Sequence, residues 1–273
     1  FKNDVKNSTI TVTGSNLVVS STGTQSVHGG IYLMKDLQSS SIHVEGGEVT
    51  AVSKYYAAAI VTNTISDTSC LSVLGTNVNS GCCAFTTSES SSSTACTCFS
   101  LHYGILTGVV NTESSVSVKN SNVVTHGKGA HGIRFNGSPN RAYLTLQNNH
   151  ITTTSSDTST SSKKPISLYM ASSSVRFVFL TIAHNQVTTQ NGYSTYFSNK
   201  PYDTRIAVYE NTFNHASFLY SSSSDCCQSS RRSAMYMACN KEGSTALTTA
   251  DSVKWGEPCD QTLAFQACGL NTA

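Results

Sequence analysis

A short pattern of apolar residues recurs seven times along the chain: an apolar residue, a second one two positions later, and a third seven positions after the first. The copies are Ile10/Val12/Leu17, Ile42/Val44/Val49, Leu71/Val73/Val78, Val116/Val118/Val123, Leu144/Leu146/Ile151, Leu180/Ile182/Val187 and Ile206/Val208/Phe213. A step of two residues is the period of a β-strand, so the first two apolar side chains point to one face and the residue between them points to the other. Each copy therefore predicts a short strand with one buried face.

The residues between the first two apolar positions are small and polar in most copies, as an outer wall requires. They are Thr11, His43, Ser72, Ser117, Thr145, Thr181 and Ala207. Turn-forming residues follow, as in Gly14-Ser15-Asn16, Gly75-Thr76-Asn77 and Asn148-Asn149. Asn and Gly tolerate the left-handed backbone conformation that a sharp bend needs. We therefore predict a bend between the first strand and a second strand that carries the third apolar residue.

A third apolar segment follows each copy after a spacer of variable length. These segments are Ile31/Leu33, Ile60, Ile105, Ile133/Phe135, Ile166/Leu168, Tyr196/Phe197 and Phe218/Leu219. The copies are 32, 29, 45, 28, 36 and 26 residues apart. A constant core pattern with connections of variable length is typical of a solenoid. Three strands per repeat predict an all-β fold, a right-handed parallel β-helix of about seven coils over residues 1–220. A β-sandwich fits less well because its hairpins would not keep one offset in every repeat, and a leucine-rich horseshoe needs far more leucine.

The repeat stops near Ser221, and the remaining residues contain half of the cysteines and the single tryptophan, Trp255. Exposed strand edges invite aggregation, so the ends of a solenoid must be covered. We predict that residues 221–273 form a disulfide-rich C-terminal cap or the start of a following region. The first coil begins without an obvious cap, which favours a fragment or packing against another chain.

Ten cysteines fall into two groups of five. The groups are Cys70, Cys82, Cys83, Cys96 and Cys98, then Cys226, Cys227, Cys239, Cys259 and Cys268. An even total in a Ser/Thr-rich chain favours disulfides in an oxidising environment. Zinc binding matches less well, because the two-residue ligand spacing of a zinc ribbon and a suitably spaced histidine are both missing.

The two cysteine groups lie on the order of 20 Å apart along the predicted axis. A disulfide needs its Cα atoms within about 7 Å. Since an odd group cannot pair completely within itself, we predict a free cysteine or an intermolecular disulfide in each group, unless a long loop reaches back between them. The partners would be other copies of the chain or other surface proteins.

Charge and hydropathy narrow the classes of partner. Charged residues make up 12% of the chain and the net charge is +2, so no basic stripe is available for nucleic acid. No apolar run approaches the roughly 18 residues of a membrane span. Sequons at Asn7 and Asn136 predict N-glycosylation in a eukaryotic source. These features favour an extracellular or cell-surface protein.

Carboxylates are too few and too scattered for the chemistry of polysaccharide-cleaving β-helices. Hydrolysis needs two carboxylates about 5–10 Å apart, and elimination needs oxygen ligands for calcium beside a basic residue. The acids on the predicted outer wall are Glu45, Glu48 and Glu210, and Glu45 lies five coils from Glu210, about 24 Å away. Loop acids are scattered over different turns, at Asp36, Asp67, Asp157 and Asp203. We predict no catalytic residue, cofactor or metal ion.

Two further features leave alternatives open. The long spacers at residues 79–98 and 153–164 should project from the same side, either as flexible or O-glycosylated loops or as a binding face. His28, His102 and His131 precede the third strand in three coils. We interpret these histidines as a surface turn column rather than a catalytic or metal-binding set.

The runs Ser115-Val116-Ser117-Val118-Lys119-Asn120-Ser121-Asn122-Val123 and Tyr143-Leu144-Thr145-Leu146-Gln147-Asn148-Asn149-His150-Ile151 resemble the coils of pectin-lyase-like β-helix proteins. With its Ser/Thr/Val-rich background and cysteine pairs, the chain is also similar to large eukaryotic surface β-helix proteins such as the dispersed gene family of trypanosomes. This resemblance covers roughly residues 8–220 and rests on repeat style and composition. It implies a β-helix at a cell surface and supplies no catalytic residues to carry over.

The sequence thus favours an extracellular structural or adhesive protein of a surface coat or filament, non-catalytic and assembling with other chains. The alternative is a carbohydrate-binding or carbohydrate-cleaving β-helix. A long groove with acids and aromatic residues within about 10 Å of one another would favour saccharide chemistry. Flat ladders of hydroxyl groups and an exposed end would favour assembly.

Overall fold

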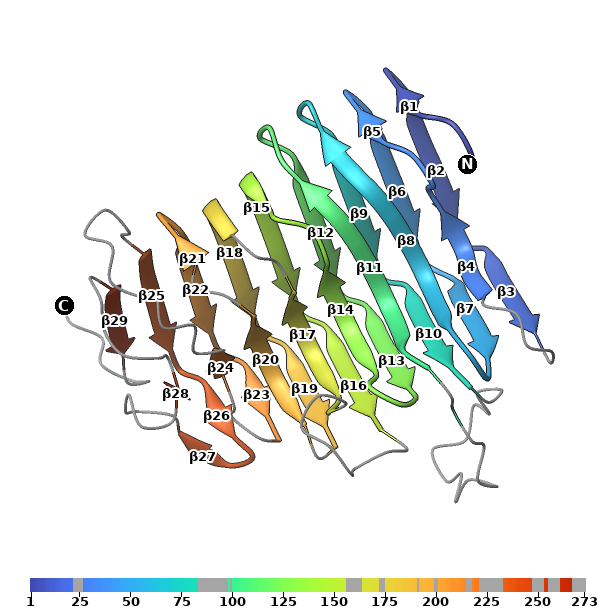
Figure 1. The fold of residues 1–273 in the computed structure, drawn as a ribbon. Coiled ribbons are helices and arrows are strands. Elements are labelled where there is room, and N and C mark those ends of the chain that lie inside the picture. The colour runs from blue at the N-terminus through green and yellow to red at the C-terminus, as the bar shows by residue number, and fades with distance from the viewer. Residues whose placement is uncertain are drawn as a thin grey trace.

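The computed structural model describes residues 1–21, 27–82, 98, 100–155, 164–171, 175–190, 192–198, 201–214, 218–220, 233–246, 253–254 and 261–266. Every regular element in these ranges is a β-strand, and the strands form three stacked sheets (Figure 1). All strand pairs are parallel in these ranges except β26 with β27. The predicted all-β parallel solenoid is confirmed, and its right-handed sense stays an expectation from the general preference of parallel crossovers.

Each coil contributes one strand to each sheet. Sheet 1 contains β2 (Thr9–Thr13), β6 (Ser41–Glu45), β9 (Cys70–Leu74), β12 (Ser115–Lys119), β15 (Asn140–Gln147), β18 (Val175–Ala183), β22 (Arg205–Tyr209), β25 (Ser233–Ala238) and β29 (Gln261–Gln266), with β21 (Pro201–Tyr202) paired to β18. Sheet 2 contains β3 (Asn16–Ser21), β7 (Glu48–Ser53), β10 (Asn77–Gly81), β13 (Asn122–His126), β16 (His150–Thr154), β19 (Gln186–Thr189), β23 (Thr212–Phe213), β26 (Lys241–Glu242) and β27 (Thr245–Ala246). Sheet 3 contains β1 (Val5–Lys6), β5 (Leu37–Gln38), β8 (Ala57–Ser66), β11 (His102–Val110), β14 (His131–Phe135), β17 (Ile166–Met170), β20 (Tyr193–Phe197), β24 (Phe218–Tyr220) and β28 (Val253–Lys254), with β4 (Val27–Tyr32) paired to β8.

The strand register turns the apolar pattern of the sequence into columns. In sheet 1, Leu71 pairs with Val116, which pairs with Leu144, and in sheet 2 Val78 pairs with Val123. From the second coil to the seventh, the first and third pattern positions are at most 4% exposed. The intervening polar residues face outward, as predicted. Stacking in register therefore buries the pattern in one narrow core from the second coil onward, and the first copy, Ile10/Val12/Leu17, is partly buried against it.

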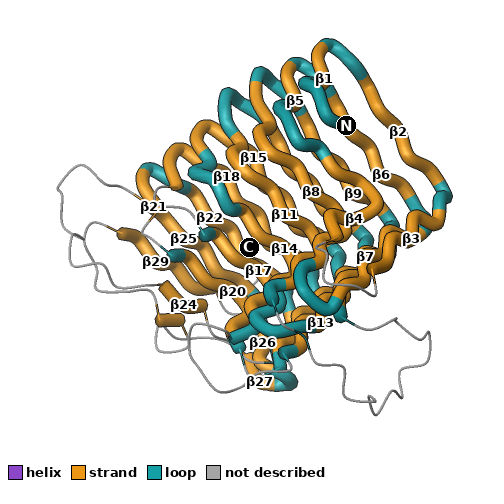
Figure 2. The backbone as a smooth tube through the Cα atoms, turned by 45° about the vertical axis from the view of Figure 1, so that its right-hand side comes forward, coloured by secondary structure: helices purple, strands orange, loops and turns teal. Residues whose placement is uncertain are grey.

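The bend between sheets 1 and 2 uses the left-handed backbone conformation in every described coil. The residues with φ between 51° and 65° at this corner are Gly14, Gly46, Gly75, Asn120, Asn148, His184, Glu210 and Cys239. Figure 2 shows the coils as a stack with loops and turns at the corners. The predicted bends are confirmed, although three coils use a residue other than Gly or Asn.

A ladder of buried asparagines follows this bend. Asn149, Asn185, Asn211 and Asn240 are each at most 2% exposed. In each step the side-chain oxygen of one asparagine accepts the backbone N–H of the preceding one, at 2.9 Å for Asn149 to Asn185 and 3.1 Å for Asn211 to Asn240. Each Nδ2 also donates to a strand carbonyl, as Asn185 does to Leu146 at 2.9 Å. The ladder satisfies backbone groups that the bend takes out of the sheets.

A second ladder, of serines, lies at the corner before sheet 1. The backbone N–H of Ser8 donates to Ser40 Oγ at 3.0 Å, that of Ser40 to Ser69 Oγ at 3.0 Å, and that of Ser69 to Ser114 Oγ at 3.2 Å. In the next two coils this column continues as Ala142 and Val178, each 1% exposed. The corner therefore stays buried after the serine ladder ends.

The sheets continue past residue 220, where the sequence pattern stops. Strand β25 pairs with β22, so that Met235 lies opposite Ile206 and Met237 opposite Val208, and β29 pairs with β25. Met237 is 1% exposed, as a core residue of an eighth coil would be. The third pattern position of this coil is the exposed Glu242, which is why the repeat is not visible in the sequence. A capping role for residues 221–273 stays a prediction.

No helix in the described part of the chain is long and apolar enough to cross a membrane.

Candidate functional site

The outer face of sheet 3 carries a continuous row of rings, which we call the aromatic column: Tyr56, Tyr103, His131, Tyr169 and Tyr196. Successive ring centroids are 5.4, 5.3, 4.8 and 5.3 Å apart. The rings come from successive coils: Tyr56 directly precedes β8, and the other four rings lie on the stacked strands β11, β14, β17 and β20. Five coils at about 4.8 Å each make the column roughly 20 Å long.

A kink in the sheet 3 strands turns these rings outward. The pairing of β11 with β14 leaves out one residue on each strand, between Tyr103 and Ile105 and between His131 and Ile133, while the register stays the same on both sides. The skipped residue of β11 is Gly104, where a Cβ would lie 2.7 Å from a side-chain carbon of Val123 in sheet 2. Tyr103 therefore packs in a cluster outside the core, while Ile105 belongs to the core.

Arg134 lies at the centre of the aromatic column. Its guanidinium carbon is 5.2 Å from the ring centroid of Tyr103 and 4.8 Å from that of Tyr169. Nη1 donates to the Tyr103 hydroxyl and to His131 Nδ1, both at 3.2 Å, and Nη2 donates to Asn136 Oδ1 at 2.7 Å. No carboxylate pairs with Arg134 among the described residues. Neutral groups alone hold this half-buried cation.

The protonation states of His131, Tyr103 and Tyr56 are those that the contacts around Arg134 require. Burial, and then the charge of Arg134, lower the pKa of His131 to about 3, so its imidazole is neutral and can accept from the guanidinium at Nδ1. Burial raises the pKa of Tyr103 and of Tyr56, so both phenols keep their protons. The site is therefore a fixed positive charge surrounded by rings and hydroxyl groups.

Polar side chains also lie beside the tyrosine rings in the later coils of the column. Lys164 Nζ lies 5.2 Å from the ring centroid of Tyr193, and Tyr193 stacks on Tyr196 at 5.7 Å. Ser198 donates to the Tyr169 hydroxyl at 2.9 Å. Tyr169, Tyr193 and Tyr196 are each half-buried. Half-exposed rings beside two cations suit a ligand with apolar C–H faces and anionic groups.

The acids of the outer wall are as dispersed as the sequence predicted. Glu210 pairs with His184 Nδ1 at 2.9 Å, and Glu48 accepts from Asn79 Nδ2 at 3.2 Å and from the Thr50 hydroxyl. Glu45 ends β6, five strand steps from the coil of Glu210, or about 24 Å. These three carboxylates do not gather into a pair for hydrolysis.

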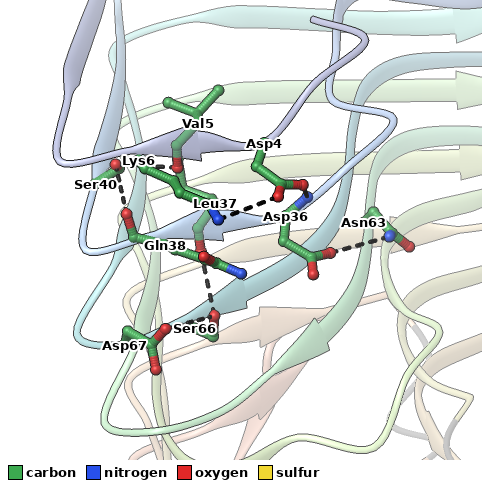
Figure 3. A network of polar contacts seen from close by, with 10 residues as sticks. All are labelled: Asp4, Val5, Lys6, Asp36, Leu37, Gln38, Ser40, Asn63, Ser66 and Asp67. Carbon is green, nitrogen blue, oxygen red and sulfur yellow. Dashed lines mark hydrogen bonds and ion pairs between the residues drawn. The ribbon is translucent and has the colours of Figure 1, made fainter.

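Acids at the N-terminal corner bind backbone and amide groups instead (Figure 3). The N–H of Asp36 donates to Asp4 Oδ1 at 3.4 Å, and Asn63 Nδ2 donates to Asp36 Oδ1 at 3.2 Å. Ser66 donates to Asp67 Oδ2 at 3.5 Å. Asp203 lies at another corner, with φ of 47°, and Asp157 lies outside the described residues.

His102 and His131 do not form the predicted surface turn column, and the side chain of His28 lies outside the described part of the structure. His131 is 5% exposed and His102 is fully buried. The register places His131 opposite Tyr103, with His102 one residue away and opposite Ala57. That prediction was wrong because the kink beside Gly104 and Gly132 sends neighbouring side chains to different faces.

The described cysteines include both bonded and free forms. Cys82 and Cys98 form a disulfide with a Cα–Cα distance of 5.5 Å, and Cys239 is disulfide-bonded. Cys70, predicted among the disulfide-bonded residues, is a half-buried free thiol whose pKa is raised by burial. A free thiol is one outcome that the odd group allows. The predictions for Cys83, Cys96, Cys226, Cys227, Cys259 and Cys268 lie outside the described residues.

Both predicted glycosylation sites are exposed. Asn7 lies at the corner before sheet 1 with φ of 48°, and Asn136 follows β14. The side-chain oxygen of Asn136 accepts a hydrogen bond from Arg134, so this amide contacts the cation at the centre of the aromatic column. Glycosylation at either site stays a prediction, and most of the two long spacers lies outside the described residues.

Comparison with protein-family models, curated proteins and solved structures gave no match for this chain.

Proposed function

We propose that this chain is an extracellular adhesive β-solenoid that binds an acidic carbohydrate chain along the aromatic column without cleaving it. The observation that carries the proposal is Arg134, a cation held by neutral groups between the rings of Tyr103 and Tyr169. A half-buried charge without a counter-ion loses hydration, and an anionic ligand group would restore its electrostatic stabilisation.

A saccharide polymer fits the spacing better than a folded protein does. The column offers about one ring per coil, which matches a ligand with a short repeat. Aromatic rings bind apolar C–H faces, while a few fixed polar groups supply orientation. Planar carboxylate groups suit the guanidinium because it can donate two parallel hydrogen bonds.

The non-catalytic part of the proposal rests on the dispersed carboxylates. The outer-wall acids Glu48 and Glu210 are each engaged by a neighbouring side chain. The location outside the cell and the likeness to pectin-lyase-like and trypanosome surface proteins remain expectations from the sequence. Assembly with other copies or other surface proteins remains one too, since burial at Cys70 disfavours the thiolate that would form an intermolecular disulfide.

Binding can be measured by calorimetry or affinity electrophoresis with a panel of uronate-containing and neutral polysaccharides. We expect a preference for the acidic polymers, and roughly five- to thirtyfold weaker binding in Tyr169→Ala, since a desolvated cation–π and stacking contact contributes roughly 1–2 kcal/mol. Tyr143→Ala is the matched control, because Tyr143 is a 49% exposed aromatic residue on sheet 1. Equal loss in both variants, or no binding by the wild type, would contradict the proposal.

Two further experiments test the preference for acidic polymers and the absence of cleavage. Arg134→Gln should reduce the preference for acidic over neutral polymers, with circular dichroism as a check on folding. Incubation of the wild type with a bound polymer should release no reducing ends and no unsaturated products. Sustained product release that depends on the protein would establish an enzyme instead.

A further inference from the structure

A second cluster of chemically reactive side chains lies at the corner between sheets 2 and 3, away from the aromatic column. The sulfur atoms of Cys82 and Cys98 and one ring nitrogen of His126 all lie within 4.8 Å of one another. Cys82 follows β10, Cys98 precedes β11 and His126 ends β13. Both cysteines are 5% exposed, so water has little access to the sulfur atoms.

His126 is oriented for a ligand by its neighbour in the next coil. Its Nδ1 lies 2.7 Å from the Thr154 hydroxyl. That contact leaves Nε2 available for another partner. A ring nitrogen fixed by a hydrogen bond on the far side of the imidazole is the usual arrangement of a metal-binding histidine.

His102 lies against the backbone next to His126, and its nitrogens are not among the ligand atoms that lie within 4.8 Å of one another. Its Nε2 lies 2.8 Å from the Ser53 carbonyl oxygen, and because a carbonyl only accepts, Nε2 carries the proton and Nδ1 carries a lone pair. The imidazole is fully buried, and Nδ1 has no hydrogen-bond partner in the described part of the chain. Such a buried acceptor costs about 1–3 kcal/mol unless something binds it.

The backbone leaves room for His102 next to His126. A Cβ on Gly127 would lie 2.2 Å from His102 Nδ1, so only glycine permits the imidazole to take this place.

We propose that Cys82, Cys98 and His126 bind a zinc ion when the Cys82–Cys98 disulfide is reduced. Two thiolates and one imidazole supply three of the four positions of a tetrahedral zinc ion, and water or another ligand can take the fourth. Tetrahedral zinc holds its ligand atoms roughly 3.3–3.8 Å apart, so a modest contraction of the cluster is enough.

The disulfide and the zinc-bound form are two alternative crosslinks at the same corner of the coil. Two molecules of a small thiol reduce the disulfide, transfer two electrons and two protons to Cys82 and Cys98, and leave as the oxidised disulfide of that thiol. Zinc then binds both sulfur atoms and releases the two thiol protons. An oxidising environment therefore favours the disulfide, and a reducing environment with available zinc favours the metal.

The test uses the full chain, reduced with an excess of a small dithiol that is then removed under anaerobic conditions, and titrated with cobalt(II) as a spectroscopic substitute for zinc. We expect one high-affinity ion displaced by zinc, with a thiolate-to-cobalt charge-transfer band that is missing in the oxidised protein. His126→Ala should weaken binding at least tenfold, and Cys82→Ser should reduce the charge-transfer band. The controls are His150→Ala, an exposed histidine on the neighbouring strand, and Cys70→Ser, which removes a thiol elsewhere.

A second measurement keeps the proposal testable if a variant fails to fold. In the reduced wild type, zinc should slow alkylation of Cys82 and Cys98 at least tenfold, as read by mass spectrometry, without slowing that of Cys70. Zinc-independent alkylation at Cys82 and Cys98, or undiminished cobalt affinity in folded His126→Ala, would overturn the site. Neither result bears on carbohydrate binding, because the aromatic column shares no residue with the cluster.

Discussion

At the scale of the residue, buried polar side chains decide how tightly each coil closes. The asparagine ladder and the serine ladder both supply hydrogen bonds to backbone groups at the corners. Asn185 makes contacts in both directions: it accepts from the Asn149 backbone at 2.9 Å and donates to Asn211 Oδ1 and the Leu146 carbonyl, both at 2.9 Å. Each ladder residue thus depends on the coil before it and the coil after it.

Asn185→Ala should lower the free energy of unfolding by roughly 2–4 kcal/mol, because it leaves several buried backbone and amide groups without partners. Denaturant unfolding followed by circular dichroism would measure the effect. Gln186→Ala is the control, since Gln186 is the next residue and is exposed. A loss below 0.5 kcal/mol in Asn185→Ala would mean that the ladder adds little to stability.

At the scale of the element, register determines which side chains enter the core. Strand β25 illustrates this because its sequence has no clear alternation, although its pairing with β22 places Met237 opposite Val208. Tyr236, one residue earlier, points to the outer face and is 40% exposed. The neighbouring strand, rather than the local pattern, therefore assigns inside and outside in this coil.

Met237→Lys should destabilise the protein by roughly 3 kcal/mol or more, because it places an unpaired charge in the core. Tyr236→Lys should change stability by no more than about 0.5 kcal/mol, as expected of a surface substitution. Thermal unfolding of both variants tests whether the coil beyond residue 220 is part of the solenoid. Equal stability of the two variants would show that it is not.

At the scale of the whole molecule, burial of neutral histidines links stability to pH. The pKa of His131 is about 3 in the folded protein and near 6.5 in an unfolded chain, so the unfolded state binds more protons between these values. Stability is therefore greatest above pH 6.5 and falls as the pH decreases toward 3. This single group contributes a slope of up to about 1.4 kcal/mol per pH unit.

Unfolding measured from pH 7 to pH 4 should show a smaller slope for His131→Asn than for the wild type, because the amide oxygen of asparagine can still accept from Arg134 but does not titrate. His102 and His126 keep their own contributions in both proteins. His43→Asn, on the outer face of sheet 1, is the matched substitution for comparison. An unchanged slope in His131→Asn would mean that this histidine takes up its proton without unfolding.

The sequence alone determined the coils, their three strands and the bends between them. That was possible because each coil carries the same apolar spacing, as in Val116/Val118/Val123, and because periodicity reports which face of a strand is buried. It also predicted correctly that Glu45 and Glu210 are too far apart to act together. Coils without the spacing, such as the one containing Met237, were missed for the same reason.

Only the tertiary structure decided which outward residues meet. Arg134 lies 31 residues after Tyr103 and 35 residues before Tyr169, and each belongs to a segment whose pattern indicates only a strand. Their contact depends on parallel register and on the kink at Gly104, which no local pattern reports. The same holds for His126, which meets the Cys82–Cys98 pair because adjacent coils place their corners one above another. Periodicity encodes burial within a coil, whereas a site is made of side chains from different coils, and stacking alone determines their distances.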